Sequence, residues 1–128
     1  MPRATSVNVL QRALAVAAAV FGVATVFAGG RVLLGADPGY VVYRPLLVFN
    51  TAMGAAYLLT GVLGWLDARR GRTGAAAIAL LNLLVLGAVA ALFLAGPGTV
   101  ARESIAAMTF RTVVWLLLWA GFARAARR

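Results

Sequence analysis

The chain contains no cysteine, no histidine and no lysine, and its only acidic residues are Asp37, Asp67 and Glu103. Without cysteine there is neither a disulfide nor a thiolate nucleophile, and without histidine the usual ligands of haem and zinc are missing. The three carboxylates form no ligand cluster and no catalytic constellation in the sequence. We therefore expect no metal, no cofactor and no enzymatic activity.

Charge of either sign is also scarce. Charged residues make up 12% of the chain and hydrophobic residues 63%, with a mean hydropathy of +0.94. A soluble domain of 128 residues would interleave charged residues to cover its surface, so this composition excludes one. The net charge of +9 does not indicate a nucleic-acid partner, because the arginines lie at the ends of apolar stretches, where membrane proteins carry them.

Most of the chain consists of long apolar runs. Uncharged runs of 18, 22 and 29 residues occupy positions 13–30, 45–66 and 73–101. A helix needs about 20 apolar residues to cross a bilayer, so each run can span one. The sequence therefore predicts an all-α fold with a single transmembrane domain over residues 1–128, with four helices near 10–30, 45–66, 74–95 and 104–123.

The last apolar run is too short to cross a membrane by itself, because Arg111 and Arg124 enclose only 12 residues. The fourth helix must therefore begin near Ser104 and carry Arg111 inside it. A charge within a spanning helix is costly, and by default it indicates a functional site.

The arginines are distributed unequally between the two sides of the predicted bundle. The N-terminal arm, the middle loop 67–73 and the C-terminus together carry eight of the twelve. Cytoplasmic segments carry such an excess, so we predict that both termini and the middle loop are cytoplasmic. Arginine without lysine, together with abundant small apolar residues, suggests a GC-rich bacterial genome and hence the bacterial inner membrane.

Small and polar residues recur at three- to four-residue spacing in the first two predicted helices. The first has Ala15, Ala18, Gly22, Thr25 and Gly29, and the second has Asn50, Gly54, Tyr57, Gly61 and Gly64. Small residues let helix backbones approach closely in lipid. The pattern predicts packing within one bundle, and dimerisation through these faces is the alternative.

Arg44 and Arg111 are predicted to lie at a similar level near the outer boundary of the hydrocarbon. A planar guanidinium suits a carboxylate or a phosphate, including that of a lipid headgroup, and Asn50 and Tyr43 are available as hydrogen-bonding groups. Arg44 and Asn50 are six residues apart, so they can flank one site but cannot line one face of a helix.

The alternative interpretation of these two arginines is structural. Glu103 lies eight residues before Arg111 on a similar helical face, and Asp37 belongs to the first outer loop. These groups can close an ion-pair network with the arginines. The predicted ligand-binding set is therefore Arg44, Arg111, Glu103, Asn50 and Tyr43, and the sequence leaves open whether it binds a ligand or pairs internally.

Polar side chains in the middle of the spans are predicted to hold the helices together. A buried amide or hydroxyl must find a protein partner, because hydrocarbon offers none. The residues expected to make such contacts are Asn82, Thr51 and Tyr57. A hydrophilic track for a substrate is the alternative, which the lack of charge along the middle of the spans disfavours.

Three segments resemble a group of small, functionally uncharacterised four-helix membrane proteins of bacteria. The segments are residues 40–50, 54–57 and 103–115. The resemblance implies a fold and a membrane location, and it implies no activity.

The sequence therefore predicts a non-catalytic multi-pass membrane protein. We expect an accessory or assembly subunit of a larger membrane complex, whose partners are the lipid bilayer and other membrane subunits or further copies of itself. The alternative is a small oligomeric transporter or channel in which an outward-facing polar cluster binds an anion or a lipid headgroup. A lipid- or quinone-binding protein is the third hypothesis.

Overall fold

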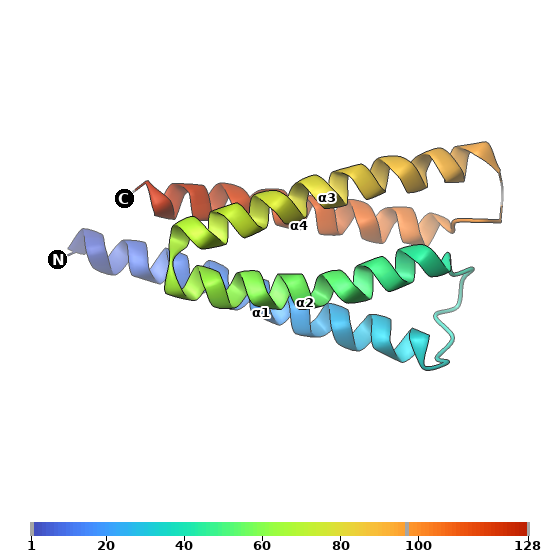
Figure 1. The fold of residues 1–128 in the computed structure, drawn as a ribbon, viewed down its shortest axis with the longest axis horizontal. Coiled ribbons are helices and arrows are strands. Elements are labelled where there is room, and N and C mark those ends of the chain that lie inside the picture. Colours follow the sequence, from blue (N-terminus) through green and yellow to red (C-terminus); the bar gives the residue numbers. More distant parts are fainter. Residues whose placement is uncertain (1, 97, 128) are drawn as a thin grey trace.

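The computed structural model describes residues 2–96 and 98–127, which form four long helices (Figure 1). The helices are α1 (Pro2–Leu33), α2 (Arg44–Leu66), α3 (Ala68–Ala95) and α4 (Arg102–Ala126). All four are long and apolar enough to cross a membrane, α1 through its segment Val9–Leu33. The predicted all-α, four-helix architecture is confirmed, and its dimensions and apolarity are those of a multi-pass membrane protein. Pro97 and Arg128 lie outside the described residues, as does the side chain of Arg3.

The helices run up and down, so that the bundle has two distinct ends. Both termini and the α2–α3 turn lie together at one end, which we call the terminal end (Figure 1). The α1–α2 loop (34–43) and the α3–α4 loop (96–101) lie together at the other, which we call the loop end. α1 packs along α2, and α3 packs along α4, whereas α1 and α4 touch much less. The bundle is therefore two tight hairpins joined by looser seams.

The α1–α2 hairpin is closed by glycines. A Cβ atom at Gly22 would lie 2.6 Å from the backbone nitrogen of Leu58 and 2.7 Å from the carbonyl oxygen of Gly54. A Cβ atom at Gly61 would lie 2.7 Å from the backbone nitrogen of Ala19. Such distances are below van der Waals contact, so only glycine lets these backbones meet. The small residues predicted from their spacing thus pack within the chain, as expected.

The turn between α2 and α3 is a single residue, Asp67, where the sequence predicted a loop over 67–73. The Asp67 side chain accepts a hydrogen bond from the backbone N–H of Arg69 at 3.0 Å and thereby caps α3. The arginines that follow are good helix formers, so the polar segment continues as helix. Gly64 and Gly71 face each other beside the turn, and a Cβ on either would strike Phe122.

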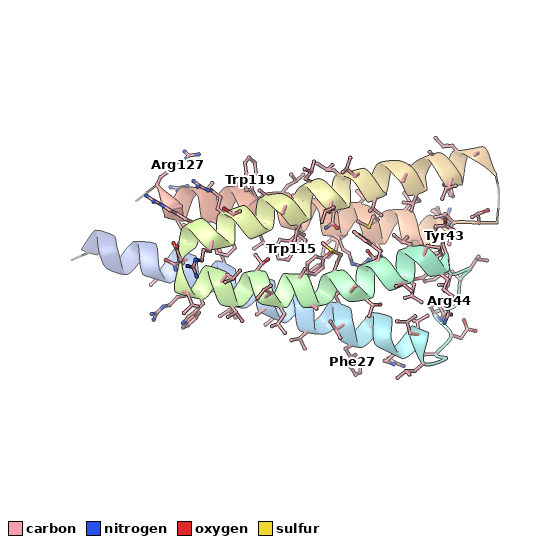
Figure 2. The ribbon with its side chains drawn as sticks, viewed as in Figure 1. Phe27, Tyr43, Arg44, Trp115, Trp119 and Arg127 are labelled. Atoms are coloured by element: carbon pink, nitrogen blue, oxygen red, sulfur yellow. The ribbon has the colours of Figure 1, made fainter. Side chains whose placement is uncertain are left out.

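The interior of the bundle contains two apolar clusters. The central cluster is aromatic: the rings of Tyr57 and Trp115 have centroids 4.7 Å apart, and Phe21 lies 5.5 Å from Tyr57. The second cluster, at the loop end, is built on Leu46, Val89, Val100 and Met108. Outward-facing side chains are also largely apolar, and Figure 2 shows Phe27 and Trp119 on the outside of the bundle. An apolar exterior over an apolar core is what a lipid environment requires.

Candidate functional site

Arg111 lies well inside α4. It follows the start of the helix at Arg102 by nine residues, which places it about 14 Å along the axis. Its side chain is partly exposed, and its Nε atom is buried with no hydrogen-bond partner among the described residues. A guanidinium at this depth is costly unless it is paired or reaches water. Arg111 therefore requires an acceptor.

The acidic side chains of the chain do not supply that acceptor. Asp67 is at the terminal end, where it caps α3. Asp37 accepts a hydrogen bond from the backbone of its own turn, and Glu103 is exposed in the first turn of α4. Within residues 2–96 and 98–127, no carboxylate lies within 4.0 Å of Arg111. The ion-pair network anticipated as one interpretation is therefore wrong for these residues.

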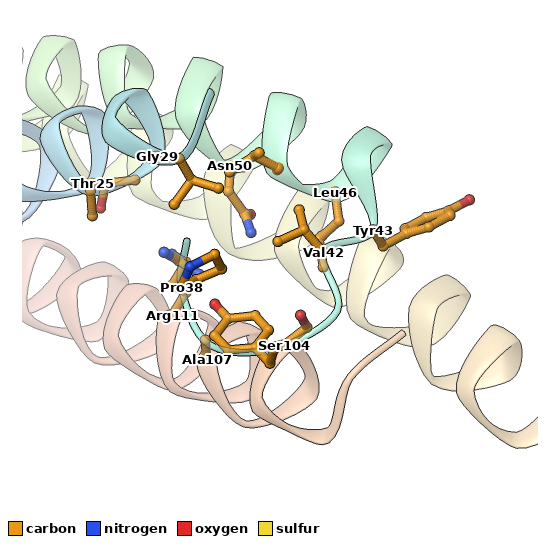
Figure 3. A pocket seen from close by; sticks show the side chains of 14 residues that line it. Thr25, Gly29, Pro38, Val42, Tyr43, Leu46, Asn50, Ser104, Ala107 and Arg111 are labelled. Carbon is orange, nitrogen blue, oxygen red and sulfur yellow. The ribbon is translucent and has the colours of Figure 1, made fainter. Parts of the chain in front are cut away.

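A cavity of about 110 Å³ extends from Arg111 toward the loop end. Polar side chains reach it from three helices, namely Thr25 of α1, Asn50 of α2, and Ser104 and Arg111 of α4. The α1–α2 loop, including Pro38, forms its outer wall. In Figure 3 the Asn50 amide and the Arg111 side chain point into the same space from opposite helices. The cavity is thus polar at its inner end.

Asn50 and Arg111 are the two cavity-lining side chains among the four described residues that have a buried polar atom without a partner; the other two, Asn82 and Trp115, lie in the core. The relative exposure of Asn50 is 9%, and its Oδ1 atom is buried without a partner among the described residues. Buried polar atoms almost always find a partner, and those that do not often mark a binding site or an unfilled position. An acceptor on Asn50 and a donor on Arg111 therefore meet at one cavity.

The lining defines which groups the cavity can hold. The Arg111 guanidinium is a planar, permanently charged donor that matches the oxygens of a carboxylate or a phosphate. The amide nitrogen of Asn50 and the hydroxyls of Thr25 and Ser104, which also line the cavity, are neutral groups that can donate hydrogen bonds to the same anion. An apolar cavity of about 150 Å³ holds a benzene molecule, so a cavity of this size suits a small anionic group rather than a whole cofactor.

The central aromatic cluster closes the cavity toward the middle of the bundle. Phe21, Tyr57 and Trp115 pack against one another, and none of the three lines the cavity. Tyr57 and Trp115 are fully buried. The polar cavity therefore ends at the level of Arg111, and an aromatic layer lies between it and the terminal end.

The predicted ligand-binding residues are only partly brought together. Arg111 and Asn50 share the cavity, but Arg44 and Glu103 are exposed and do not line it. Arg44 is the first residue of α2, so it lies at the end of its helix, whereas Arg111 is embedded in α4. Tyr43 touches the cavity, but its ring points away (Figure 3) and packs on the loop-end cluster. The prediction that Arg44 lies level with Arg111 and shares its site is therefore wrong.

Three polar lining residues were not predicted, namely Thr25, Tyr40 and Ser104. Ser104 precedes Arg111 by seven residues, close to two helical turns, so both lie on one face of α4. This seven-residue spacing would have been enough to predict Ser104 as a neighbour of Arg111. Thr25 comes from α1, and the register that brings it beside Arg111 depends on how the two hairpins pack.

Of the predicted polar contacts between helices, the one between Asn82 and Tyr57 is confirmed and the one from Thr51 is wrong. The Asn82 side-chain nitrogen donates to the Tyr57 hydroxyl at 3.3 Å and joins α3 to α2 in the buried centre, as predicted. Thr51 instead donates to the carbonyl oxygen of Leu47 in its own helix at 2.8 Å. Its side chain meets α1 by packing beside Gly29. Thr51 therefore contributes van der Waals packing between α1 and α2, and its hydroxyl makes no hydrogen bond between them.

Comparison with known proteins gives no relative: no protein-family model, no curated protein and no solved structure matches the chain. Among the described residues there is also no group of three or more Asp, Glu, His or Cys side chains placed to hold a metal ion. The chemistry of the cavity must therefore be inferred from the residues that line it.

Proposed function

We propose that this is a non-catalytic multi-pass membrane protein that binds the anionic group of a small molecule, a carboxylate or a phosphate, in the Arg111 cavity. The observation that supports it most directly is the arginine itself. Its Nε is buried and has no partner among the residues that the structure describes, the three acidic side chains lie elsewhere, and a polar cavity adjoins it. A bound anion satisfies the guanidinium and leaves no charge unpaired in the membrane.

The proposed orientation places the cavity on the outer side of the bacterial inner membrane. In the sequence the N-terminal arm, residues 67–73 and the C-terminal segment together carry eight of the twelve arginines, and such an excess favours the cytoplasm. The chain has no cysteine, so single cysteines can report the topology directly. Thr73→Cys at the terminal end should react with an impermeant maleimide only after cell lysis, and Thr99→Cys at the loop end should react in intact cells. The reverse pattern would place the cavity on the cytoplasmic side.

The binding proposal is tested by native mass spectrometry of protein extracted gently from its own membrane. We expect a bound acidic molecule on the wild-type chain that is lost in Arg111→Gln. Arg44→Gln is the matched control, because Arg44 is an exposed arginine at the same end that does not line the cavity. Equal retention of the molecule by both variants would contradict the proposal.

Transport through the same cavity is a less direct proposal. The aromatic layer of Phe21, Tyr57 and Trp115 lies between the cavity and the terminal end, so an oligomeric transporter would have to displace packed rings. We therefore propose binding without flux. Proteoliposomes that release an anion in an Arg111-dependent manner would favour the transporter instead.

A role as an accessory subunit is a second proposal, supported by a separate feature. An apolar groove of about 260 Å³ runs between α1 and α2 on the outside of the bundle, over the small residues Ala15, Ala19 and Gly61. Small residues at a groove permit the close approach of another helix. Val62→Trp would fill this groove and should release any partner subunit seen by native mass spectrometry. Leu59→Trp, on an exposed residue outside the groove, should not.

A further inference from the structure

A second hollow adjoins the Arg111 cavity and opens sideways. It has a volume of about 230 Å³ and lies in the seam between α1 and α4. Four residues line both spaces, namely Thr25, Ala28, Ala107 and Arg111. Arg111 therefore stands at the junction of a polar cavity and a lateral groove.

The groove differs from the cavity in chemistry. Beyond the shared residues it is lined by Ala24 and by the rings of Phe21 and Phe110, which lie 6.1 Å apart. Phe110 and Ala24 are exposed on the outer surface of the bundle, where lipid chains would surround them. The seam is open because α1 and α4 contact each other least among neighbouring helices, and alanines leave room between them. The groove is thus an apolar slot with one charged end.

The two spaces also extend in opposite directions from Arg111. The cavity runs toward the loop end, where Pro38 and Tyr40 line it. The groove runs toward the middle of the bundle, because Phe21 precedes Thr25 by four residues, about 6 Å along α1. A lipid in the leaflet at the loop end has the same arrangement, with its headgroup toward that surface and its tail toward the centre of the bilayer.

We propose that the ligand of the Arg111 cavity is an anionic amphiphile that enters from the bilayer. Its carboxylate or phosphate lies in the cavity against Arg111 and Asn50, and its hydrocarbon tail leaves between α1 and α4 along Phe21 and Phe110. This inference rests on the proposed anion site and names its substrate class. A free anion of the same chemistry would use the cavity and leave the groove to membrane lipid.

The experiment uses Trp115, which lies one helical turn after Arg111 and whose ring centroid is 6.5 Å from that of Phe21 in the groove. Trp65→Phe and Trp119→Phe, both at exposed positions, leave it as the only tryptophan. Dibromostearate, whose bromines quench indole fluorescence, is titrated into the purified protein. Butyrate and inorganic phosphate are titrated by calorimetry as anions without a long tail.

We expect saturable quenching of Trp115 by dibromostearate. Loss of the charge in Arg111→Gln should weaken binding by about tenfold or more. Ala24→Phe, which fills the groove without touching the cavity, should also weaken it by about tenfold or more, because several buried methylenes are displaced. Ala17→Phe is the same change at an exposed α1 position outside the groove and should bind like the parent. The probe partitions into the detergent micelle equally for all variants. The ratio of the variants' apparent dissociation constants therefore reports binding at the site.

The outcomes separate this inference from the proposed function. If butyrate or phosphate binds in an Arg111-dependent manner and Ala24→Phe changes nothing, the anion site stands and the amphiphile is wrong. If no probe depends on Arg111, both proposals are wrong. If Ala24→Phe does not give a monodisperse protein, the test is the dependence of the parent protein's affinity on the length of the ligand's tail. Octanoate must then bind more tightly than butyrate, and equal affinities would overturn the inference.

Discussion

The two sides of α1 use similar residues to opposite effect. Toward α2, Gly22 meets the backbone of Leu58 so closely that no side chain fits between the helices. Toward α4, Ala24 and Ala28 leave a slot that continues into a polar cavity. Small residues therefore do not by themselves close a helix pair. They close it where the partner also presents glycine, and they leave space where the partner presents Arg111 and Phe110.

The difference separates a closely packed seam from the seam that contains the proposed ligand site. The α1–α2 seam leaves no room for another molecule at Gly22. The α1–α4 seam contains the Arg111 guanidinium, whose Nε has no partner among the described residues, and a groove that continues into the polar cavity, and both features lower stability in the absence of a ligand. The following experiments test this contrast.

The contrast should be clearest in alanine substitutions of two α1 glycines. Gly22→Ala forces α1 and α2 apart, because a Cβ there would lie 2.6 Å from the Leu58 backbone nitrogen, and backbone cannot rotate away. We expect destabilisation of about 3 kcal/mol, at the upper end for overpacking. Gly30→Ala meets nothing within 4 Å and should gain up to about 1 kcal/mol from helix propensity. Thermal unfolding in detergent, followed by tryptophan fluorescence, measures both effects. Equal unfolding midpoints for the two variants would contradict the close packing of α1 against α2 at Gly22.

The α1–α4 seam should respond in the opposite direction. Arg111→Leu removes an unpaired charge from a spanning helix and should stabilise the ligand-free protein by roughly 2 kcal/mol, somewhat below the insertion cost of arginine at a helix centre. Arg44→Leu is the control, since Arg44 is exposed at the start of α2 and its loss should leave stability nearly unchanged. The same unfolding assay applies. A destabilised Arg111→Leu would show that the guanidinium has a structural role.

Most of the fold could be predicted from the sequence because the bilayer imposes it. Run length sets the helices, and Pro45 at the start of α2 and glycine after Ala95 set two of their ends. The prediction of a loop over residues 67–73 is wrong, because all but the first of these charged and polar residues are helical. Asp67 caps α3, and Arg69, Arg70 and Arg72 lie in its first turns. The cluster of charges therefore marks where the helices leave the apolar region and does not mark a long loop.

The candidate site was less predictable because it depends on tertiary register. Counting residues along one helix correctly predicts that Arg111 lies inside α4, whereas the prediction that it lies level with Arg44 is wrong. Which side chains surround Arg111 depends on how α1 and α2 rotate against α4, and a single sequence does not contain that rotation. For this reason the sequence predicts Asn50 beside Arg111, as the cavity shows, but it also predicts Arg44, which does not line the cavity, and it does not predict Thr25.

The buried amide between α2 and α3 tests whether the centre is held by polar bonds as well as by shape. Tyr57→Phe removes the oxygen that accepts from Asn82 and leaves that amide without its partner in the fully buried centre. We expect a loss of about 1 kcal/mol, the usual scale for hydrogen bonds between spanning helices. A double-mutant cycle with Asn82→Leu isolates the pair. A coupling energy near zero would show that packing of the rings alone holds α2 against α3.

At the terminal end, the α1–α2 seam has a polar contact that should have a small effect. The Gln11 side-chain nitrogen donates to the carbonyl oxygens of Gly64 at 2.9 Å and Trp65 at 3.2 Å, which lie in the last turn of α2 and have no partner within that helix. Gln11→Ala should destabilise by about 0.5–1 kcal/mol. Gln11→Glu removes the donor and adds a negative charge at a helix C-terminus, so it should be at least as harmful. Gln11→Lys restores a donor with favourable charge and should return stability to the parent value. If lysine and glutamate behave alike in the unfolding assay, Gln11 contributes only packing, and glycine contacts alone account for the tightness of this seam.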